Sequence, residues 1–131
     1  MRNFILLASV LILASSCSKD EDPIKPVDLS IDTISGVWKL TDTYISPGGE
    51  TTWQSVENGR EYTFHPDGSF ELSEGECLSG TYSIREGMIE FQCNTSESVP
   101  RSFYISEFTN STMEISYIGC IEACIYRYQK Q

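Results

Sequence analysis

The chain has 131 residues, of which 19 are acidic and 9 are basic, so its formal net charge is −10 at pH 7. This excess argues against nucleic acid and anionic lipid surfaces as partners, because phosphate groups are bound by clusters of Lys and Arg and the sequence has none. The length suffices for one domain with a modest core and not for two.

Residues 1–16 have the pattern of a secretory signal peptide. Arg2 supplies a positive charge, an almost uninterrupted apolar run extends from Phe4 to Ala14, and two small residues lead to Cys17. The run is too short to span a bilayer as a mature helix. The small residues before the cysteine resemble the lipobox of bacterial lipoproteins, although the lipobox usually has leucine where this chain has Ala14. The resemblance implies that Cys17 is lipidated and anchors the mature protein to a membrane. The alternative is an ordinary signal peptide with an unmodified Cys17.

Residues 17–31 are expected to form a flexible tether between this anchor and the domain. Acidic side chains are mixed there with Pro23 and Pro26, and such segments stay extended instead of packing. The sequence Ser-Lys-Asp-Glu-Asp at positions 18–22 is similar to a signal that sends lipoproteins to the cell surface in some Gram-negative bacteria. The resemblance implies an outer-membrane location facing outside the cell. The alternative is a solvated linker that carries no targeting signal.

Residues 32–131 are predicted to form one all-β domain. From Gly36 onward apolar residues recur with a period of two, turn residues follow at short intervals, and no run of helical periodicity occurs. Pro66-Asp67-Gly68 and Glu86-Gly87 mark two tight hairpins. The pattern predicts eight strands at about 37–45, 59–65, 69–74, 78–84, 88–93, 101–107, 112–119 and 124–130.

Eight short antiparallel strands in sequence order fit an up-and-down β-barrel, and a two-sheet β-sandwich is the alternative. The Gly36-Val37-Trp38 entry to the first strand resembles the Gly-x-Trp opening of lipocalins. This resemblance implies that Trp38 plugs the closed end of the barrel and that a basic residue of the last strand, Arg127 or Lys130, packs over it. The chain differs from true lipocalins because no long C-terminal helix is recognisable.

Four cysteines besides Cys17 in an exported chain suggest two disulfides. The strand order of a barrel brings all four to the end opposite Gly36, which we call the mouth. Among three possible connectivities this order favours the pairs Cys77–Cys93 and Cys120–Cys124. Regular pairing around the Glu86-Gly87 turn puts Cys93 opposite position 80, so we expect a β-bulge near residues 79–80. A four-cysteine zinc site is a poorer fit, because no short Cys-x-x-Cys pair is present.

Signals for catalysis are weak. His65 is the single histidine and lies in a predicted turn, no nucleophile motif accompanies it, and no metal-spaced or phosphate-binding motif occurs. We therefore expect a monomeric, non-enzymatic protein with no cofactor and no metal.

The inward-facing positions are rich in aromatic residues, which is compatible with ligand binding or with a filled core. Our first hypothesis is that a small apolar or amphipathic ligand binds in or at the mouth, which requires a cavity of at least about 300 Å³. The expected lining residues are Asp42, Tyr44, Trp53, Tyr82, Phe91 and Tyr117. Asp42 is included because it alternates in phase with Trp38 and Tyr44 along the first strand, unless a bulge turns it outward. The second hypothesis is a filled barrel whose mouth loops bind a protein or a glycan.

The tether joins the domain beside Gly36, at the closed end. We therefore expect the mouth to face away from the membrane.

Overall fold

The computed structural model describes residues 26–95 and 100–131. The predicted signal peptide, Cys17 and the acidic run after it lie outside these residues. No helix in the described part of the chain has the length and apolar character needed to cross a membrane. The described ranges contain one short helix and nine strands: α1 (Ile31–Ile34), β1 (Gly36–Ser46), β2 (Gln54–Ser55), β3 (Glu61–Phe64), β4 (Ser69–Leu72), β5 (Ser79–Arg85), β6 (Met88–Cys93), β7 (Arg101–Phe108), β8 (Thr112–Tyr117) and β9 (Ala123–Lys130).

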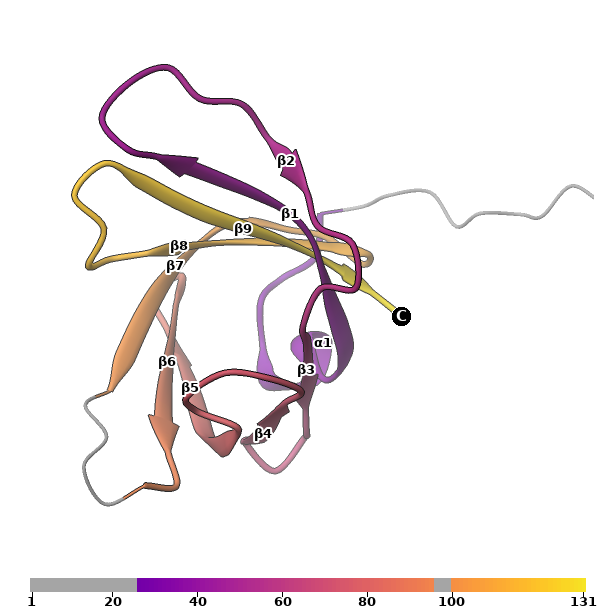
Figure 1. Cartoon of the computed structure of the whole chain (residues 1–131). Helices are drawn as coiled ribbons and strands as arrows, with labels where there is room; N and C mark the ends of the chain where they lie inside the picture. Colours follow the sequence, from indigo (N-terminus) through magenta and orange to yellow (C-terminus); the bar gives the residue numbers. More distant parts are fainter. Residues whose placement is uncertain (1–25, 96–99) are drawn as a thin grey trace, which may run out of the picture.

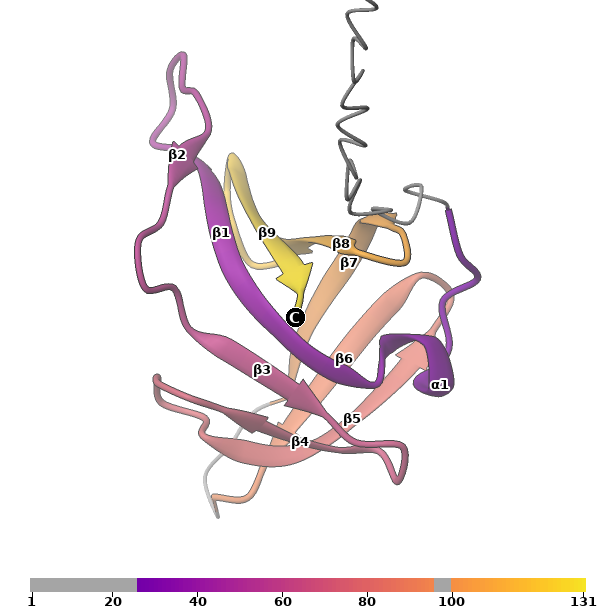
Figure 2. The same ribbon diagram turned by 90° about the vertical axis from the view of Figure 1, so that its right-hand side faces the viewer.

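The strands form a closed antiparallel barrel (Figures 1 and 2). Strands β3 to β9 follow each other in sequence order, β1 pairs with β3 on one side, and β1 also pairs with β9, which closes the sheet. This confirms the predicted eight-stranded lipocalin-like barrel, and the sandwich alternative is not observed. The two-residue strand β2 lies outside the barrel order, where Ser55 pairs with Asp42 and Gln54 with Thr43 of β1.

The sequence pattern did not predict α1 or β2. Helix α1 has a single turn, too short to produce helical periodicity, and a capping box holds its start. The Ser30 hydroxyl accepts a hydrogen bond from the Thr33 amide at 3.2 Å, and the Thr33 hydroxyl accepts one from the Ser30 amide at 2.8 Å. The helix packs the buried side chain of Ile34 beneath the closed end of the barrel.

The closed end is centred on Trp38, which is fully buried. Its indole N–H donates to the carbonyl oxygen of Ile34 at 2.7 Å. The ammonium of Lys130 lies 5.2 Å from the centre of the Trp38 ring and donates to the Thr33 carbonyl at 3.0 Å. Gly36 has a φ of +126°, and a side chain there would press on Lys130. Lys130 therefore takes the position over Trp38.

The closed-end role that we expected for Arg127 is wrong. Arg127 lies on the outer face of β9, because its neighbour Tyr128 points into the barrel and is fully buried. The Arg127 guanidinium stacks 3.9 Å from the centre of the Trp53 ring and forms ion pairs with Glu114 at 2.7 Å and Asp42 at 4.0 Å. Arg127 thus stabilises the outer wall near the mouth.

Aromatic side chains fill the barrel interior. Tyr62 lies at the centre, with ring centroids 5.2 Å from Phe91, 5.3 Å from Phe64 and 5.5 Å from Tyr128. Such pairs contribute about 0.5–1.5 kcal/mol beyond the area that they bury. The large buried side chains around them complete one continuous core. The interior of the barrel is therefore packed.

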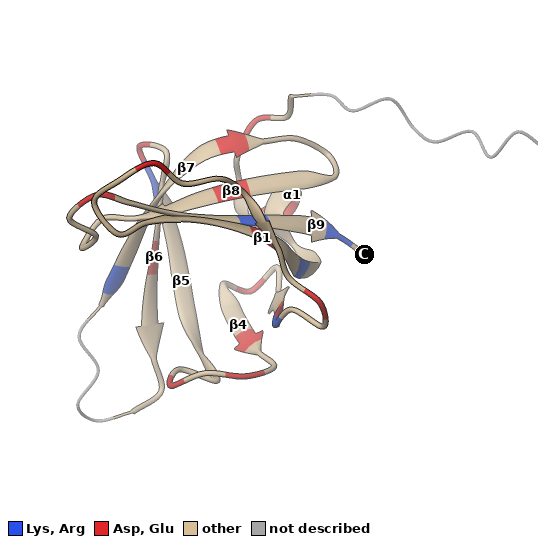
Figure 3. Cartoon of the chain, turned by 45° about the horizontal axis from the view of Figure 1, so that its top comes forward, with Lys and Arg blue, Asp and Glu red and all other residues tan. Residues whose placement is uncertain are grey.

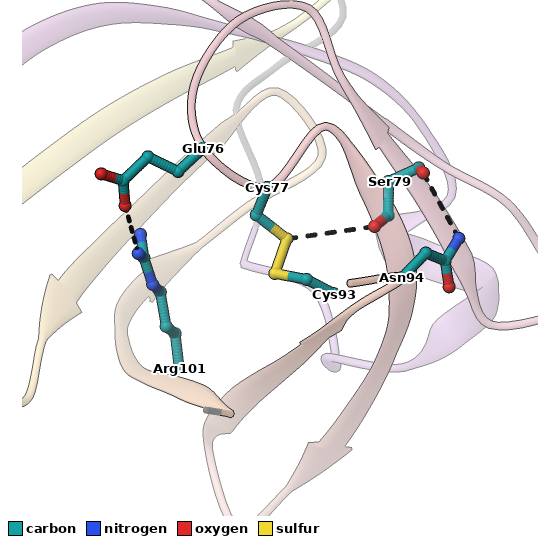
Figure 4. Close-up of a disulfide and its surroundings, with 6 residues drawn as sticks. All are labelled: Glu76, Cys77, Ser79, Cys93, Asn94 and Arg101. Atoms are coloured by element: carbon teal, nitrogen blue, oxygen red, sulfur yellow. Dashed lines mark hydrogen bonds and ion pairs between the residues drawn. A yellow bond between two sulfur atoms is a disulfide. The ribbon is translucent and has the colours of Figure 1, made fainter. Parts of the chain in front are cut away.

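The structure joins Cys77 to Cys93 and Cys120 to Cys124, the pairing that the sequence favoured. The bulge expected near residues 79–80 is absent, because Gly80 pairs directly with Cys93 and β5 begins only at Ser79. Cys77 instead reaches its partner from the loop before β5, with Cα atoms 5.5 Å apart (Figure 4). A side chain at position 80 would collide with the Gln92 carbonyl oxygen, so only glycine fits there.

Candidate functional site

A pocket of about 60 Å³ opens to solvent at the mouth of the barrel. Inward-facing residues of β3, β4, β6 and β7 form its walls, and the β4–β5 loop forms part of its rim. Its apolar walls come from Tyr62, Phe70, Leu72, Phe91 and Phe103, and its polar lining comes from Arg60, Glu76 and Arg101. Apolar walls beside two guanidinium groups are chemically suited to the polar end of an amphipathic molecule and the carbons next to it.

The size of this pocket corrects the first hypothesis. That hypothesis required a cavity of at least about 300 Å³ in or at the mouth, and the pocket that opens into the barrel there has a volume of about 60 Å³. That volume holds a few water molecules or one small chemical group. Among the described residues, the aromatic core occupies the space that a larger cavity would need. A ligand at this site is therefore bound at the mouth and not inside the barrel.

The rim of the pocket carries an ion pair beside a disulfide (Figure 4). Arg101 donates to the Glu76 carboxylate at 2.6 Å, and the Cys77–Cys93 bond links the same loop to the end of β6. The Arg101 side chain is 49% exposed and that of Glu76 is 84% exposed. An ion pair so open to water contributes little to stability, so the disulfide holds this loop in place.

Arg60 lies deeper than Arg101. Its Nε–H donates to the Tyr128 hydroxyl at 3.2 Å, and its guanidinium lies 5.4 Å from the centre of the Tyr126 ring. Burial lowers the pKa of Arg60, but the neighbouring hydroxyls of Tyr128, Tyr62 and Tyr126 outweigh it and leave the pKa raised. Arg60 is therefore a permanent cation beside the aromatic core.

Burial also raises the pKa of the Tyr62 and Tyr128 hydroxyls above the ordinary value of 10.0, although Arg60 opposes this effect. Both phenols therefore stay neutral at physiological pH. The Tyr128 hydroxyl accepts a hydrogen bond from Arg60 without supplying a negative charge. The tyrosines orient the guanidinium and leave its charge uncompensated.

The structure separates the six predicted lining residues. Phe91 lines the mouth pocket, while the Tyr82 hydroxyl donates to the His65 carbonyl at 2.9 Å, toward the closed end. Tyr117 is not part of this pocket: its ring lies 5.3 Å from that of Phe103, and it lines a separate open hollow of about 490 Å³ beside the β8–β9 loop. The other three residues, Asp42, Tyr44 and Trp53, gather on the outer wall near Arg127.

A β-bulge explains this separation. Leu40 pairs with Tyr128 but Asp42 pairs with Arg127, so one residue of β1 is extra and the following side chains change face. Asp42 and Tyr44 therefore point outward, the alternative that the sequence left open for Asp42. The Tyr44 ring lies 5.6 Å from Trp53, which draws the β1–β2 loop against the outer wall.

Sequence reasoning missed Arg60, Arg101 and Glu76. A weak signal was present, because Arg60 and Arg101 are 2 of only 9 basic residues and both lie where a mouth loop enters a strand. A metal site is also not observed: within residues 26–95 and 100–131, no group of three or more His, Cys, Asp or Glu side chains is arranged to hold a metal ion. The acidic residues of the described chain, red in Figure 3, are spread over several strands and loops.

Comparisons with known proteins point to the same architecture. Residues 34–115 match the family model described as a lipocalin-like domain. A similar solved structure is the crystal structure of an uncharacterized protein from Bacteroides eggerthii DSM 20697, with a TM-score of 0.54 and 22% sequence identity. The match covers 74% of this chain and 98% of that chain, and at this identity it shows the fold alone. No curated protein matches the chain.

Proposed function

Because this chain belongs to the family of lipocalin-like domains, we propose that it is a non-enzymatic binding module that holds a small amphipathic ligand at its barrel mouth. One observation carries the proposal: the pocket combines apolar walls with guanidinium groups and is open to solvent. Apolar walls with a few convergent polar groups are the usual composition of ligand sites. One small group of the ligand enters the pocket, and the remainder lies across the mouth.

We further propose that lipid on Cys17 anchors the protein to the outer membrane with the mouth facing outward. The domain entry supports this orientation, since Pro26 pairs with Thr109 in the turn between β7 and β8. The Val27 amide also donates to the Phe108 carbonyl at 3.4 Å. This turn lies at the closed end, so Pro26 and Val27 enter the domain on the side opposite the pocket.

Filling the pocket is expected to abolish ligand binding without unfolding the domain. Leu72→Phe adds a ring to a buried wall residue where unfilled space adjoins it, so we expect little loss of stability. Native mass spectrometry of protein isolated from its own cells should show a bound small molecule on the wild type and not on Leu72→Phe. Ile31→Phe, which changes an exposed residue below the closed end, is the control. Retention of the ligand by Leu72→Phe, or its loss from both variants, would contradict a site at the mouth.

Lipidation of Cys17 can be tested separately from ligand binding. Intact-mass analysis of the mature protein should place the N-terminus at Cys17, with an added mass of acyl chains, and the protein should fractionate with membranes. Cys17→Ala should be released into the soluble fraction, because a stable anchor requires the acyl chains. An unmodified terminus in membrane-bound wild-type protein would refute lipidation.

A second candidate function, recognition of a protein at the mouth tip, has its own support. The β8–β9 loop, closed by the Cys120–Cys124 bond, presents Ile121 at 98% exposure. Ile45 and Ile118 are also exposed at this end of the molecule. Apolar side chains so open to water are typical of contact surfaces. Loss of the ligand in Leu72→Phe separates the first function from this one, because the tip lies outside the pocket.

A further inference from the structure

Arg60 differs from the other arginine of the pocket in its partners. Arg101 forms an ion pair with Glu76 at 2.6 Å, whereas none of the ion pairs among the described residues includes Arg60. The contacts of Arg60 are the Tyr128 hydroxyl and the Tyr126 ring, and both are neutral. The pocket therefore contains one compensated and one uncompensated guanidinium.

An uncompensated cation in this position is unusual for such an acidic chain. Burying part of a charge costs free energy unless an opposite charge or sufficient hydrogen bonds replace the lost water. The chain has 19 acidic residues, so carboxylates are abundant, yet none of those within residues 26–95 and 100–131 forms an ion pair with Arg60. Only Nε of its nitrogens forms a hydrogen bond within the described residues, so most of its five N–H donors remain for a ligand.

Arg60 is one of the residues that line the pocket. Arg60 shares the inward face with Tyr62, two residues along the chain, and both line the pocket. The pocket volume of about 60 Å³ accommodates one small head group but not a chain. The apolar walls formed by Leu72 and Phe103 lie in the same opening and suit the first carbons after the head group.

We propose that the mouth pocket binds the carboxylate head group of an amphiphile, with Arg60 as the residue that recognises its negative charge. This inference rests on the proposed binding of an amphipathic ligand at the mouth and names its chemical class. The planar guanidinium offers paired N–H donors that match the two oxygens of a carboxylate. The acyl chain runs outward past the apolar walls, while Arg101 remains paired with Glu76.

The test compares three ten-carbon probes that differ in their head group: decanoate, decanol and decyltrimethylammonium. Isothermal titration calorimetry on the wild-type protein should show decanoate binding at least roughly tenfold more tightly than decanol, since hydrogen bonds to charged groups are the strong ones. Decyltrimethylammonium should bind more weakly than both. Raising the salt concentration should weaken decanoate binding and leave decanol binding unchanged.

Variants assign the preference to Arg60. In Arg60→Gln, decanoate affinity should fall to that of decanol, whereas the matched variant Arg85→Gln, which removes an exposed arginine of β5 outside the pocket, should keep the preference for decanoate. Thermal melts verify that each variant is folded, and the wild-type comparison of probes stands even if Arg60→Gln is not.

Equal binding of decanoate and decanol in the wild type would overturn the carboxylate inference and leave the proposed function intact. A preference for decanoate that survives Arg60→Gln would overturn the role of Arg60. Failure of all three probes to bind would count against both proposals.

Discussion

Replacing Trp38 with alanine is expected to lower the free energy of unfolding by about 3–5 kcal/mol, the range for truncating a large buried aromatic side chain. Trp38 is fully buried, its ring centroid lies 5.7 Å from that of Phe108, and its N–H is bonded to Ile34. The alanine variant leaves a void at the closed end and removes the ring beneath Lys130. For a domain of this size the melting temperature should fall by roughly 15–25 °C.

Trp53 supplies a matched control, because the chain has 2 tryptophans and the second lies on the outer wall. Trp53→Ala removes a half-buried ring stacked on Arg127 and should cost about 1 kcal/mol, in the range of a cation–π contact. Urea denaturation followed by circular dichroism measures both variants. Each variant also retains a single tryptophan, whose fluorescence reports on the other site. Equal destabilisation by the two substitutions would contradict a central role for Trp38.

Removing the Cys77–Cys93 disulfide is expected to have the second largest effect. The two cysteines are separated by 16 residues in the sequence. In the chain-entropy treatment, a bond that closes a loop of this length stabilises the folded protein by about 3 kcal/mol, because it restricts the unfolded chain. Cys77 is also buried in the core cluster, so Cys77→Ala/Cys93→Ala loses packing as well. This double variant should unfold at lower urea concentration and should bind a mouth ligand more weakly, since the pocket wall is no longer fixed.

The double variant Cys120→Ala/Cys124→Ala is the control. The Cys120–Cys124 bond spans a sequence separation of 4, for which the same treatment gives a stabilisation of about 2 kcal/mol. Neither cysteine lies in the core cluster. Its destabilisation should therefore be the smaller of the two, and ligand binding in the mouth pocket should be retained. The opposite order of stabilities would show that the β4–β5 loop is held by something other than its disulfide.

The barrel was predictable because its strands are nearly regular. Alternating burial along β3, β4 and β6 produces the period of two that the sequence displays. The turns at Pro66-Asp67-Gly68 and Glu86-Gly87 fixed two hairpins, and Gly87 and Gly68 have the positive φ that such turns require. Local chemistry therefore specified strand order and most strand boundaries.

The candidate site was only partly predictable, because it depends on register and side-chain geometry. One extra residue between Leu40 and Asp42 reverses the face of the following side chains, and no residue in that stretch marks a bulge. The same shift removed Tyr44 and Trp53 from the expected lining. Within the described part of the chain, the lack of an ion pair at Arg60 is a property of the three-dimensional arrangement and has no counterpart in the spacing of residues along the chain.

The stacking of Trp53 on Arg127 also has a kinetic consequence. It ties the end of the long β1–β2 loop to the outside of the barrel, and Figure 1 shows this connection rising above β1 and β9. A loop held in this way does not serve as a lid over the pocket. A small molecule bound at the mouth would therefore exchange without opening of this loop.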